Sequence, residues 1–225
     1  MVNGNYIDNA GEGIYSEPEG GSVDIFVTDT LTCRNNNINL ESGSLIPMGT
    51  IIADNCTITV EGTELDLSAG EVGYLEYNLD TTGDNNDALG NSDYGVALDI
   101  YTDVGTTGDL EVTFSTEKPE LGGYYYSNFG KYIDVTLNLN DGAVLDYAII
   151  KIYYTDEELT AAGLTEDTLR IEYYNDTSST WEIFDAPRGG VNIEENYVWA
   201  NVTHFSTYGV FGSAPASSAA TGGDS

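Results

Sequence analysis

Alternating apolar and polar positions run through most of the chain and predict β-strands. The longest apolar run is Y-A-I-I-K-I-Y-Y, from Tyr147 to Tyr154, and only Lys151 interrupts it. A run of this length, rich in β-branched and aromatic residues, is too short for a typical helix and fits a strand that is covered on both faces. We therefore expect it to be the buried central strand of the domain around it.

Further segments show the same strand-like pattern, and two local signals lie between them. The segments are 23–32, 44–52, 55–60, 63–67, 71–79, 94–102, 109–116, 131–139, 168–174, 180–184, 197–203 and 205–211. Glu61-Gly62 is placed where a two-residue hairpin turn would be. Thr155 and Glu158 form a T-x-x-E capping box, and Gly163 is available to end the helix that it starts. The pattern predicts an all-β protein with one short helix near residues 156–162.

Glycine and proline divide this pattern into parts. Residues 1–22 are rich in glycine and show little periodicity, so we expect a loosely lying, extended leader. The stretch K-P-E-L-G-G at 118–123 marks a boundary, and we expect two antiparallel β-sandwich-like domains, at 23–116 and 117–212. Residues 213–225 are small and polar and predict a flexible Ser/Ala/Gly tail.

The net charge narrows the choice of partners and compartment. The chain has 38 Asp and Glu against 6 Lys and Arg, a formal charge of −32. Such a surface repels nucleic acid, so we expect no nucleic-acid partner. High salt or divalent cations would relieve the self-repulsion, and either condition points outside an ordinary cytosol.

One acidic loop is a candidate metal site. D-T-T-G-D-N-N-D-A-L-G-N-S-D, from Asp80 to Asp93, concentrates oxygen ligands around two glycines. Hard cations prefer such oxygens, so we take Asp80, Asp84, Asp87 and Asp93 as a candidate calcium site, with calcium as the candidate cofactor. The spacing differs from that of an EF-hand, and a solvated acidic loop is the alternative.

The cysteines and the glycosylation sequons bear on export. Cys33 and Cys56 lie in strand-like surroundings and predict a disulfide, which requires an oxidising compartment. Two free buried thiols in a reducing compartment are the alternative. Asn55, Asn175 and Asn201 each begin an N-x-Ser/Thr sequon for N-glycosylation, although a chain so rich in these residues also produces sequons by composition alone.

Catalytic and aromatic candidates are few. His204 is the only histidine, which excludes His-clustered metal sites and makes any Ser-His-Asp triad depend on it alone. It lies at a strand junction, where a structural or surface role is ordinary, so we predict no enzyme. Tyr124, Tyr125 and Tyr126 with Tyr197 and Trp199 would form an aromatic platform for sugar rings or another subunit, unless they are ordinary sheet packing.

Targeting signals are not evident in the sequence. No stretch reaches the roughly 18 apolar residues of a membrane span. Residues 1–4 lack the basic and apolar regions of a signal peptide. We expect an exported protein whose signal has been removed, and a native cytosolic start is the alternative.

The C-terminal half resembles a known family through an ordered series of motifs. The series is the strand with Ile149, Ile150 and Ile152, then T-D-E-E-L at 155–159, Leu164, D-T-L at 167–169, Tyr173-Tyr174, Trp181, E-E-N at 194–196 and H-F-S-T-Y at 204–208. It resembles the PGF-pre-PGF domain of archaeal surface proteins, especially of methanogens and haloarchaea, over roughly residues 109–212. The resemblance implies a β-sandwich-like module of secreted S-layer or surface-anchored proteins, without catalytic residues.

These features together predict the location and the role of the protein. We expect an extracellular structural or adhesive component of an archaeal cell surface, either a wall-layer piece or a subunit of an extracellular assembly. Its partners would be further copies, other surface proteins or glycans. A carbohydrate-binding module of a secreted protein is the alternative, and a secreted hydrolase is a weaker third hypothesis.

Overall fold

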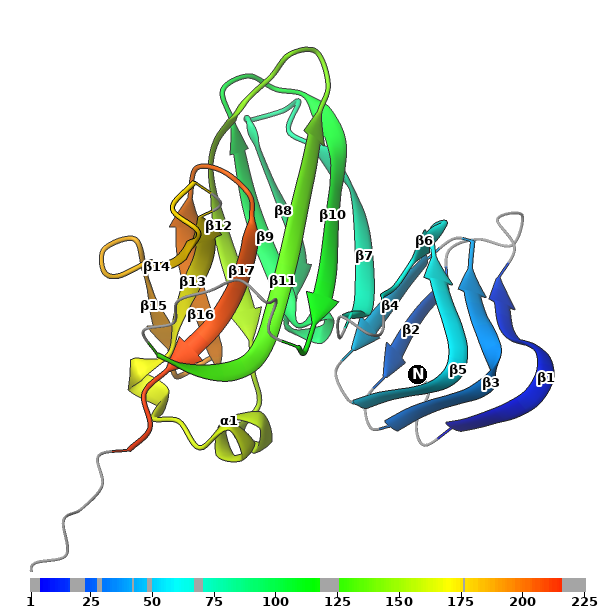
Figure 1. Ribbon diagram of the computed structural model, residues 1–225. Helices are drawn as coiled ribbons and strands as arrows, with labels where there is room; N and C mark the ends of the chain where they lie inside the picture. Colours follow the sequence, from blue (N-terminus) through cyan, green and yellow to red (C-terminus); the bar gives the residue numbers. More distant parts are fainter. Residues whose placement is uncertain are drawn as a thin grey trace, which may run out of the picture.

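The computed structural model describes residues 5–16, 23–27, 30–41, 43–47, 50–66, 71–117, 126–175 and 177–215. These residues are mostly β with one short α-helix, which confirms the predicted fold class. Figure 1 shows two parts, an N-terminal coil and a larger sandwich. The strands of the N-terminal coil are β1 (Asn5–Ser16), β2 (Val23–Val27), β3 (Thr30–Leu40), β4 (Gly43–Pro47), β5 (Thr50–Val60) and β6 (Thr63–Glu64).

The sandwich contains the remaining elements. Its strands are β7 (Glu71–Asp80), β8 (Asn86–Asn91), β9 (Val96–Thr102), β10 (Thr107–Ser115), β11 (Ser127–Leu139), β12 (Leu145–Tyr153), β13 (Arg170–Asn175), β14 (Thr180–Ile183), β15 (Gly189–Asn192), β16 (Tyr197–Val202) and β17 (Thr207–Gly212). Its helices are α1 (Asp156–Ala162) and the 3-10 turns η3 (Ser92–Tyr94) and η4 (Glu166–Thr168).

The N-terminal coil is built from parallel strands. β1, β3 and β5 lie side by side in parallel, and so do β2 and β4. One turn of the coil consists of β2 and β3, and the next consists of β4 and β5. Paired residues of these two turns are 20 positions apart in the sequence, since residue 23 pairs with residue 43 and residue 33 with residue 53. Apolar residues therefore stack turn on turn inside the coil, in the pairs Ile25/Leu45, Leu31/Ile51, Ile38/Ile58 and Leu40/Val60.

This architecture corrects two expectations for the N-terminal half. The predicted antiparallel sandwich does not form there, because each turn lays its strands beside the equivalent strands of the next turn. The predicted loose leader is also wrong for residues 5–16, which form β1 and pair with β3. The predicted hairpin at Glu61-Gly62 is confirmed, since β5 and β6 pair antiparallel across it.

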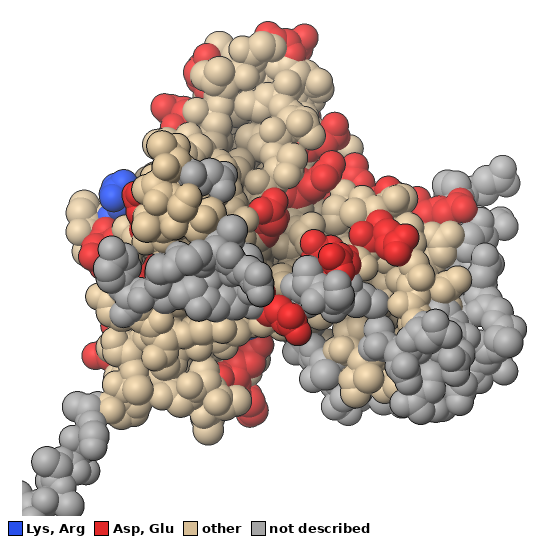
Figure 2. Space-filling model, viewed as in Figure 1, with Lys and Arg blue, Asp and Glu red and all other residues tan. Residues whose placement is uncertain are grey.

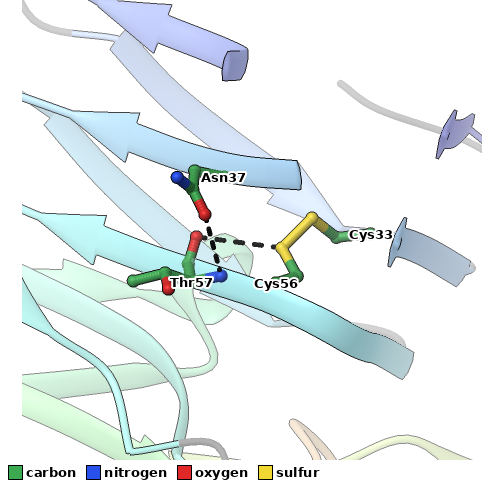
Figure 3. The surroundings of a disulfide bond; sticks show 4 residues. All are labelled: Cys33, Asn37, Cys56 and Thr57. Atoms are coloured by element: carbon green, nitrogen blue, oxygen red, sulfur yellow. Dashed lines mark hydrogen bonds between the residues drawn. A yellow bond between two sulfur atoms is a disulfide. The ribbon is translucent and has the colours of Figure 1, made fainter. Parts of the chain in front are cut away.

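The predicted disulfide is confirmed, and it links successive turns of the coil. Cys33 on β3 and Cys56 on β5 are bonded, with their Cα atoms 5.9 Å apart (Figure 3). Cys33 lies opposite Ala53 and Cys56 opposite Asn36, so the bond runs diagonally between neighbouring strands. Beside it, the Thr57 amide donates a 3.3 Å hydrogen bond to Asn37 Oδ1, a further bond between the same two turns.

The sandwich consists of two sheets that face each other across one core. The eight-stranded sheet has the order β14-β13-β17-β11-β10-β7-β4-β2, and the five-stranded sheet has the order β15-β16-β12-β9-β8. A single cluster of buried side chains, which includes Leu75, Leu98, Ile150, Val198 and Val210, fills the space between them. Because β4 of the coil pairs with β7, the coil continues one sheet of the sandwich.

The expected boundary near residue 117 falls inside this sandwich. β10 before it pairs with β11 after it, and β9 pairs with β12 in the opposite sheet. Residues from both sides also share the single core, so the architecture changes earlier, between β6 and β7. The glycine-rich stretch 118–123 and the tail from 216 onward lie outside the described residues.

The strand expected at 147–154 is central, but only one of its faces is covered. In β12, Ala148, Ile150 and Ile152 are buried in the core, whereas Tyr147, Ile149, Lys151 and Tyr153 are half-buried on the other face. The expectation of a strand covered on both faces is therefore wrong. Long amphipathic side chains such as tyrosine and lysine shield the backbone while their polar ends stay in water.

The predicted helix is confirmed with its caps. Thr155 Oγ1 accepts a hydrogen bond from the Glu158 amide, and a Glu158 carboxylate oxygen accepts one from the Thr155 amide. Gly163 ends the helix with φ 64°, in the left-handed region that glycine adopts without strain. The helix joins the end of β12 to the segment leading into β13.

The one-sided burial of β12 gives the first testable prediction. Ile150→Asn places an amide in the core and should lower the free energy of unfolding by about 3–5 kcal/mol, because a cavity and an unbonded polar group are created together. Ile149→Asn, on the half-exposed face of the same strand, is the matched control and should cost about 1 kcal/mol or less. Urea unfolding followed by circular dichroism measures both. Equal losses would contradict the assigned orientation of the strand.

Candidate functional site

The outward side of the five-stranded sheet is the most distinctive surface of the described residues. Ladder partners lie directly opposite one another, so their side chains share a face. The pairs Tyr147/Tyr101, Lys151/Trp199 and Tyr153/Tyr197 therefore lie together, opposite the core. We call this surface the outer aromatic face; its residues are Asp99, Tyr101, Tyr147, Ile149, Lys151, Tyr153, Tyr197, Trp199 and Asn201.

Two pairs of tyrosines stand at opposite ends of this face. Tyr101 and Tyr147 stack with their ring centroids 4.2 Å apart and their planes at 12°. Tyr153 and Tyr197 meet edge to face with centroids 5.4 Å apart. Along β12, Tyr147 and Tyr153 are separated by about 20 Å at the usual strand rise. The face is thus long enough to contact an extended ligand at both ends.

Trp199 lies between the tyrosine pairs, and its orientation follows from a glycine. A Cβ atom added at Gly190 on the neighbouring edge strand β15 would lie 3.4 Å from Trp199 Nε1 and 3.8 Å from Cε2. The indole therefore extends over the position where any other residue would carry a side chain. The ring atoms nearest to Gly190 belong to the Nε1 edge of the indole, and the Trp199 side chain as a whole is half-buried. An indole held in this way offers a flat surface for stacking.

An ion pair occupies the middle of the face. Lys151 Nζ is 3.1 Å from Asp99 Oδ2, and both side chains are partly buried. Burial by itself lowers the pKa of Lys151, but the hydrogen bond and the charge of Asp99 outweigh it and raise that pKa. The lysine therefore remains a cation over the whole physiological range. Its ammonium also lies 6.0 Å from the Tyr197 ring centroid, and Asn192 Nδ2 donates to the Tyr197 hydroxyl at 3.0 Å.

A second candidate is a groove between the two sheets at the end of the sandwich next to α1. It has a volume of about 380 Å³, and its lining is mainly aromatic and aliphatic, including Tyr94, Phe114 and Ile152. Lys131 Nζ borders it, 2.8 Å from Glu158 Oε1 and 2.8 Å from the Tyr153 carbonyl oxygen, to which it donates. The groove suits an apolar group better than a charged one.

The outward side of the eight-stranded sheet carries a buried carboxyl group. Glu172 on β13 is 0% exposed, and neither of its carboxylate oxygens has a hydrogen-bond partner. It lies opposite Gly209, where the rings of Tyr132 and Phe211 pack, and these belong to an aromatic cluster with Tyr174 and Trp181. Burial raises the pKa of Glu172 to about 7; Arg170 lowers it and Asp185 raises it to smaller extents.

The four aspartates predicted to bind calcium are not gathered into one site. Asp80, Asp84 and Asp87 lie near the β7–β8 turn, whereas Asp93 follows β8 at its other end, about 20 Å away at the usual strand rise. Asp80 Oδ1 already accepts hydrogen bonds from the Thr82 amide and hydroxyl, which lower the pKa of Asp80. The described part of the chain contains no group of three or more His, Cys, Asp or Glu side chains able to hold a metal ion.

The sequons are placed differently from one another. Asn175 is engaged in its turn: Oδ1 accepts from the Thr177 amide at 2.9 Å, and Nδ2 donates to Glu182 Oε1 at 2.6 Å. A glycan on Nδ2 would have to displace the bond to Glu182. Asn201 is half-buried on the outer aromatic face. The side chain of Asn55 lies outside the described residues.

The predicted aromatic platform is divided between the two sheets. Tyr197 and Trp199 share the outer aromatic face, but Tyr126 packs against the aromatic cluster on the other sheet, with the Arg170 guanidinium 4.1 Å from its ring centroid. Tyr124 and Tyr125 lie outside the described residues. His204 is exposed in a loop, 5.1 Å from the Tyr173 ring, and its carbonyl oxygen accepts a 2.6 Å bond from Tyr208 Oη.

Sequence reasoning missed most of the outer aromatic face. Tyr147, Lys151 and Tyr153 were not taken as site residues, because the run 147–154 was interpreted as buried on both sides. Asp99 and Tyr101 lie in another predicted strand, and the pairing that brings them to this face is not visible in the sequence. The available signal was Lys151 itself, flanked at two-residue spacing by Ile149 and Tyr153. A charged residue in phase with tyrosines indicates a strand face that reaches water.

Comparisons with known proteins add no family to this description. No protein-family model matches the chain, and no curated protein sequence matches it. The likeness to the PGF-pre-PGF domain therefore stays a prediction that depends on the order of short motifs. The candidate site is defined by its geometry alone.

The buried Glu172 gives the second prediction. Its pKa of about 7 in the fold exceeds the ordinary glutamate value of 4.5, so between these values the folded state binds more protons and stability falls as pH rises. Glu172→Gln should match the wild type at pH 5 and exceed its free energy of unfolding by about 2 kcal/mol at pH 8. Urea unfolding at the two pH values, at one ionic strength, makes the comparison.

A neighbouring carboxylate supplies the control for this prediction. Tyr173 and Asn175 donate hydrogen bonds to Glu182, which lower the pKa of Glu182. Glu182→Gln should therefore reduce stability at pH 8, the opposite sign to Glu172→Gln. If the free energy of unfolding changed equally with pH in the wild type and in Glu172→Gln, ionisation of Glu172 would not destabilise the fold. That result would contradict its burial.

Proposed function

We propose that this chain is an extracellular structural or adhesive module of a cell surface, of the kind that the archaeal resemblance implies. The observation that carries the proposal is the disulfide between Cys33 and Cys56. Structural disulfides form and persist in oxidising compartments and are rare in the cytosol, so the bond indicates a non-cytoplasmic protein. None of the described helices is long and apolar enough to cross a membrane.

The position of the disulfide supports a structural role. In the described residues the N-terminal coil has two complete turns, and its core is a small cluster around Leu31, Ile38 and Ile58. A cross-link between its turns restricts the unfolded chain and stabilises the coil by about 3 kcal/mol for a loop of this length. Such a link suits a structural part of a protein outside the cell.

The sheet edges and the charge support assembly that depends on salt. β1 ends the four-stranded sheet and β2 ends the eight-stranded sheet in the described part of the chain. Edge strands are templates for pairing with another chain. Figure 2 shows acidic side chains spread over both the coil and the sandwich, with few basic ones in view. Repulsion between copies would oppose edge pairing unless salt screens it.

Thiol chemistry tests the extracellular part of the proposal. Protein isolated without reductant should take up no alkylating agent, and its intact mass should increase by two alkyl groups only after reduction. The double variant Cys33→Ser with Cys56→Ser should lose about 3 kcal/mol of stability. Two alkylated thiols in unreduced protein would remove the case for export.

Negative-stain imaging and size-exclusion chromatography test the structural part. At 1 M NaCl the screening length falls to about 3 Å, and the chain should form particles or filaments. At about 0.01 M NaCl, where charges interact over about 30 Å, it should elute as a monomer. A monomer at every salt concentration would contradict assembly of the isolated chain.

A further inference from the structure

We infer that the outer aromatic face binds an uncharged glycan, whose sugar rings stack on Trp199 and on the two tyrosine pairs. Of the residues on this face, the sequence singled out only Tyr197 and Trp199. It grouped them with Tyr126, which packs on the other sheet. The structure instead brings five aromatic rings to one face, from β9, β12 and β16. The inference names a ligand class for a surface, and it rests on the proposed extracellular function.

The flat apolar surfaces match one side of a sugar. A pyranose ring exposes axial C–H bonds on its faces, and these pack against aromatic rings, whose faces carry partial negative charge. The Nε1 edge of the Trp199 indole lies beside Gly190, which has no side chain to cover it. Because tyrosine pairs stand at both ends of the face, a chain of several sugars would contact rings along its length.

The polar groups of the face match the hydroxyl groups around the edge of a sugar ring. Equatorial hydroxyls require donors and acceptors in the plane of the sheet surface, between the stacking rings. Lys151 Nζ supplies donors and Asp99 supplies carboxylate oxygens at 3.1 Å from it, and Asn201 adds an amide on the strand next to β12. Aromatic walls with a few fixed polar groups are the usual composition of small-ligand sites.

Charge selects the class of glycan. The chain carries a net charge of −32, so acidic polysaccharides are repelled at long range. Lys151 and Asp99 neutralise each other in the middle of the face, which leaves no excess cation to hold a carboxylate or sulfate. The centre of a protein–protein interface is depleted in charged residues, whereas here the ion pair is central. An uncharged, hydroxyl-rich ligand fits these conditions.

The test uses the intact, oxidised chain on an array of neutral, acidic and amino-sugar oligosaccharides. The wild type is expected to bind uncharged oligosaccharides of several rings, and the best of them is then titrated by calorimetry. Trp199→Ala should weaken binding at least tenfold, because the largest stacking surface is lost. Lys151→Met, which keeps the aliphatic stem and removes the donors, should weaken it several-fold.

Matched controls separate stacking from folding. Trp199→Phe keeps an aromatic ring and should retain most of the affinity. Tyr126→Ala removes an aromatic ring from the other sheet and should bind as the wild type does, with melting curves recorded for every variant. The inference is overturned if no array sugar binds, if only charged sugars bind, or if Trp199→Ala and Lys151→Met both retain wild-type affinity.

Failure of the glycan-binding inference can be distinguished from failure of the proposed extracellular function. Free thiols in unreduced protein would remove the extracellular proposal, whatever the array shows. Oxidised protein that assembles in high salt but binds no sugar would remove only the present inference.

Discussion

The alternation of side chains along β12 is the constraint on which the rest of the sandwich depends. Every second residue, Ala148, Ile150 and Ile152, enters the core and meets strands of the opposite sheet. A shift of one residue would exchange the two faces, so the register is held strongly by hydrophobic burial. Once those three residues are inside, Tyr147, Lys151 and Tyr153 must point outward.

The same constraint places residues from distant parts of the sequence together. β9 and β16 flank β12 in antiparallel ladders, and each contributes its own alternate residues to the outer aromatic face. Asp99 and Trp199 are 100 positions apart in the chain. Both lie next to Lys151 because the three strands share one pattern of buried residues. The core therefore specifies the surface.

The N-terminal coil is stabilised differently from the sandwich. Its strands pair with equivalent strands of the next turn, so each turn buries its apolar residues only when another turn covers it. The last turn is covered partly by continuity with the eight-stranded sheet, through the pairing of Leu45 with Tyr74. The disulfide adds a covalent link where the core is smallest.

Local signals in the sequence predicted what depends on neighbours in the chain. The capping box at Thr155, the turn at Glu61-Gly62 and most strand positions were correct, because each is determined by a few adjacent residues. The pairing of Cys33 with Cys56 was also correct, since two cysteines allow a single bridge. The 20-residue repeat was missed, although Ile25 and Leu45, or Ile38 and Ile58, recur at that spacing.

What the sequence did not predict depends on contacts between distant segments. The boundary expected near residue 117 followed glycine and proline, but hydrogen bonding joins β10 to β11 across it. The calcium loop had suitable ligands, but β8 runs between Asp87 and Asp93 and holds them apart. In both cases the path of the chain, which composition does not reveal, determined where these residues lie.

Fluorescence quenching by acrylamide tests the central claim, the one-sided exposure of the five-stranded sheet, most directly. The chain has two tryptophans: Trp181 is 0% exposed in the aromatic cluster, and Trp199 lies on the outer aromatic face. In the wild type, acrylamide should strongly quench the fluorescence component from Trp199. In Trp199→Phe this component should be absent, and acrylamide should hardly quench the remaining fluorescence of Trp181. Equal, weak quenching in both proteins would show that the face is covered and would contradict the account.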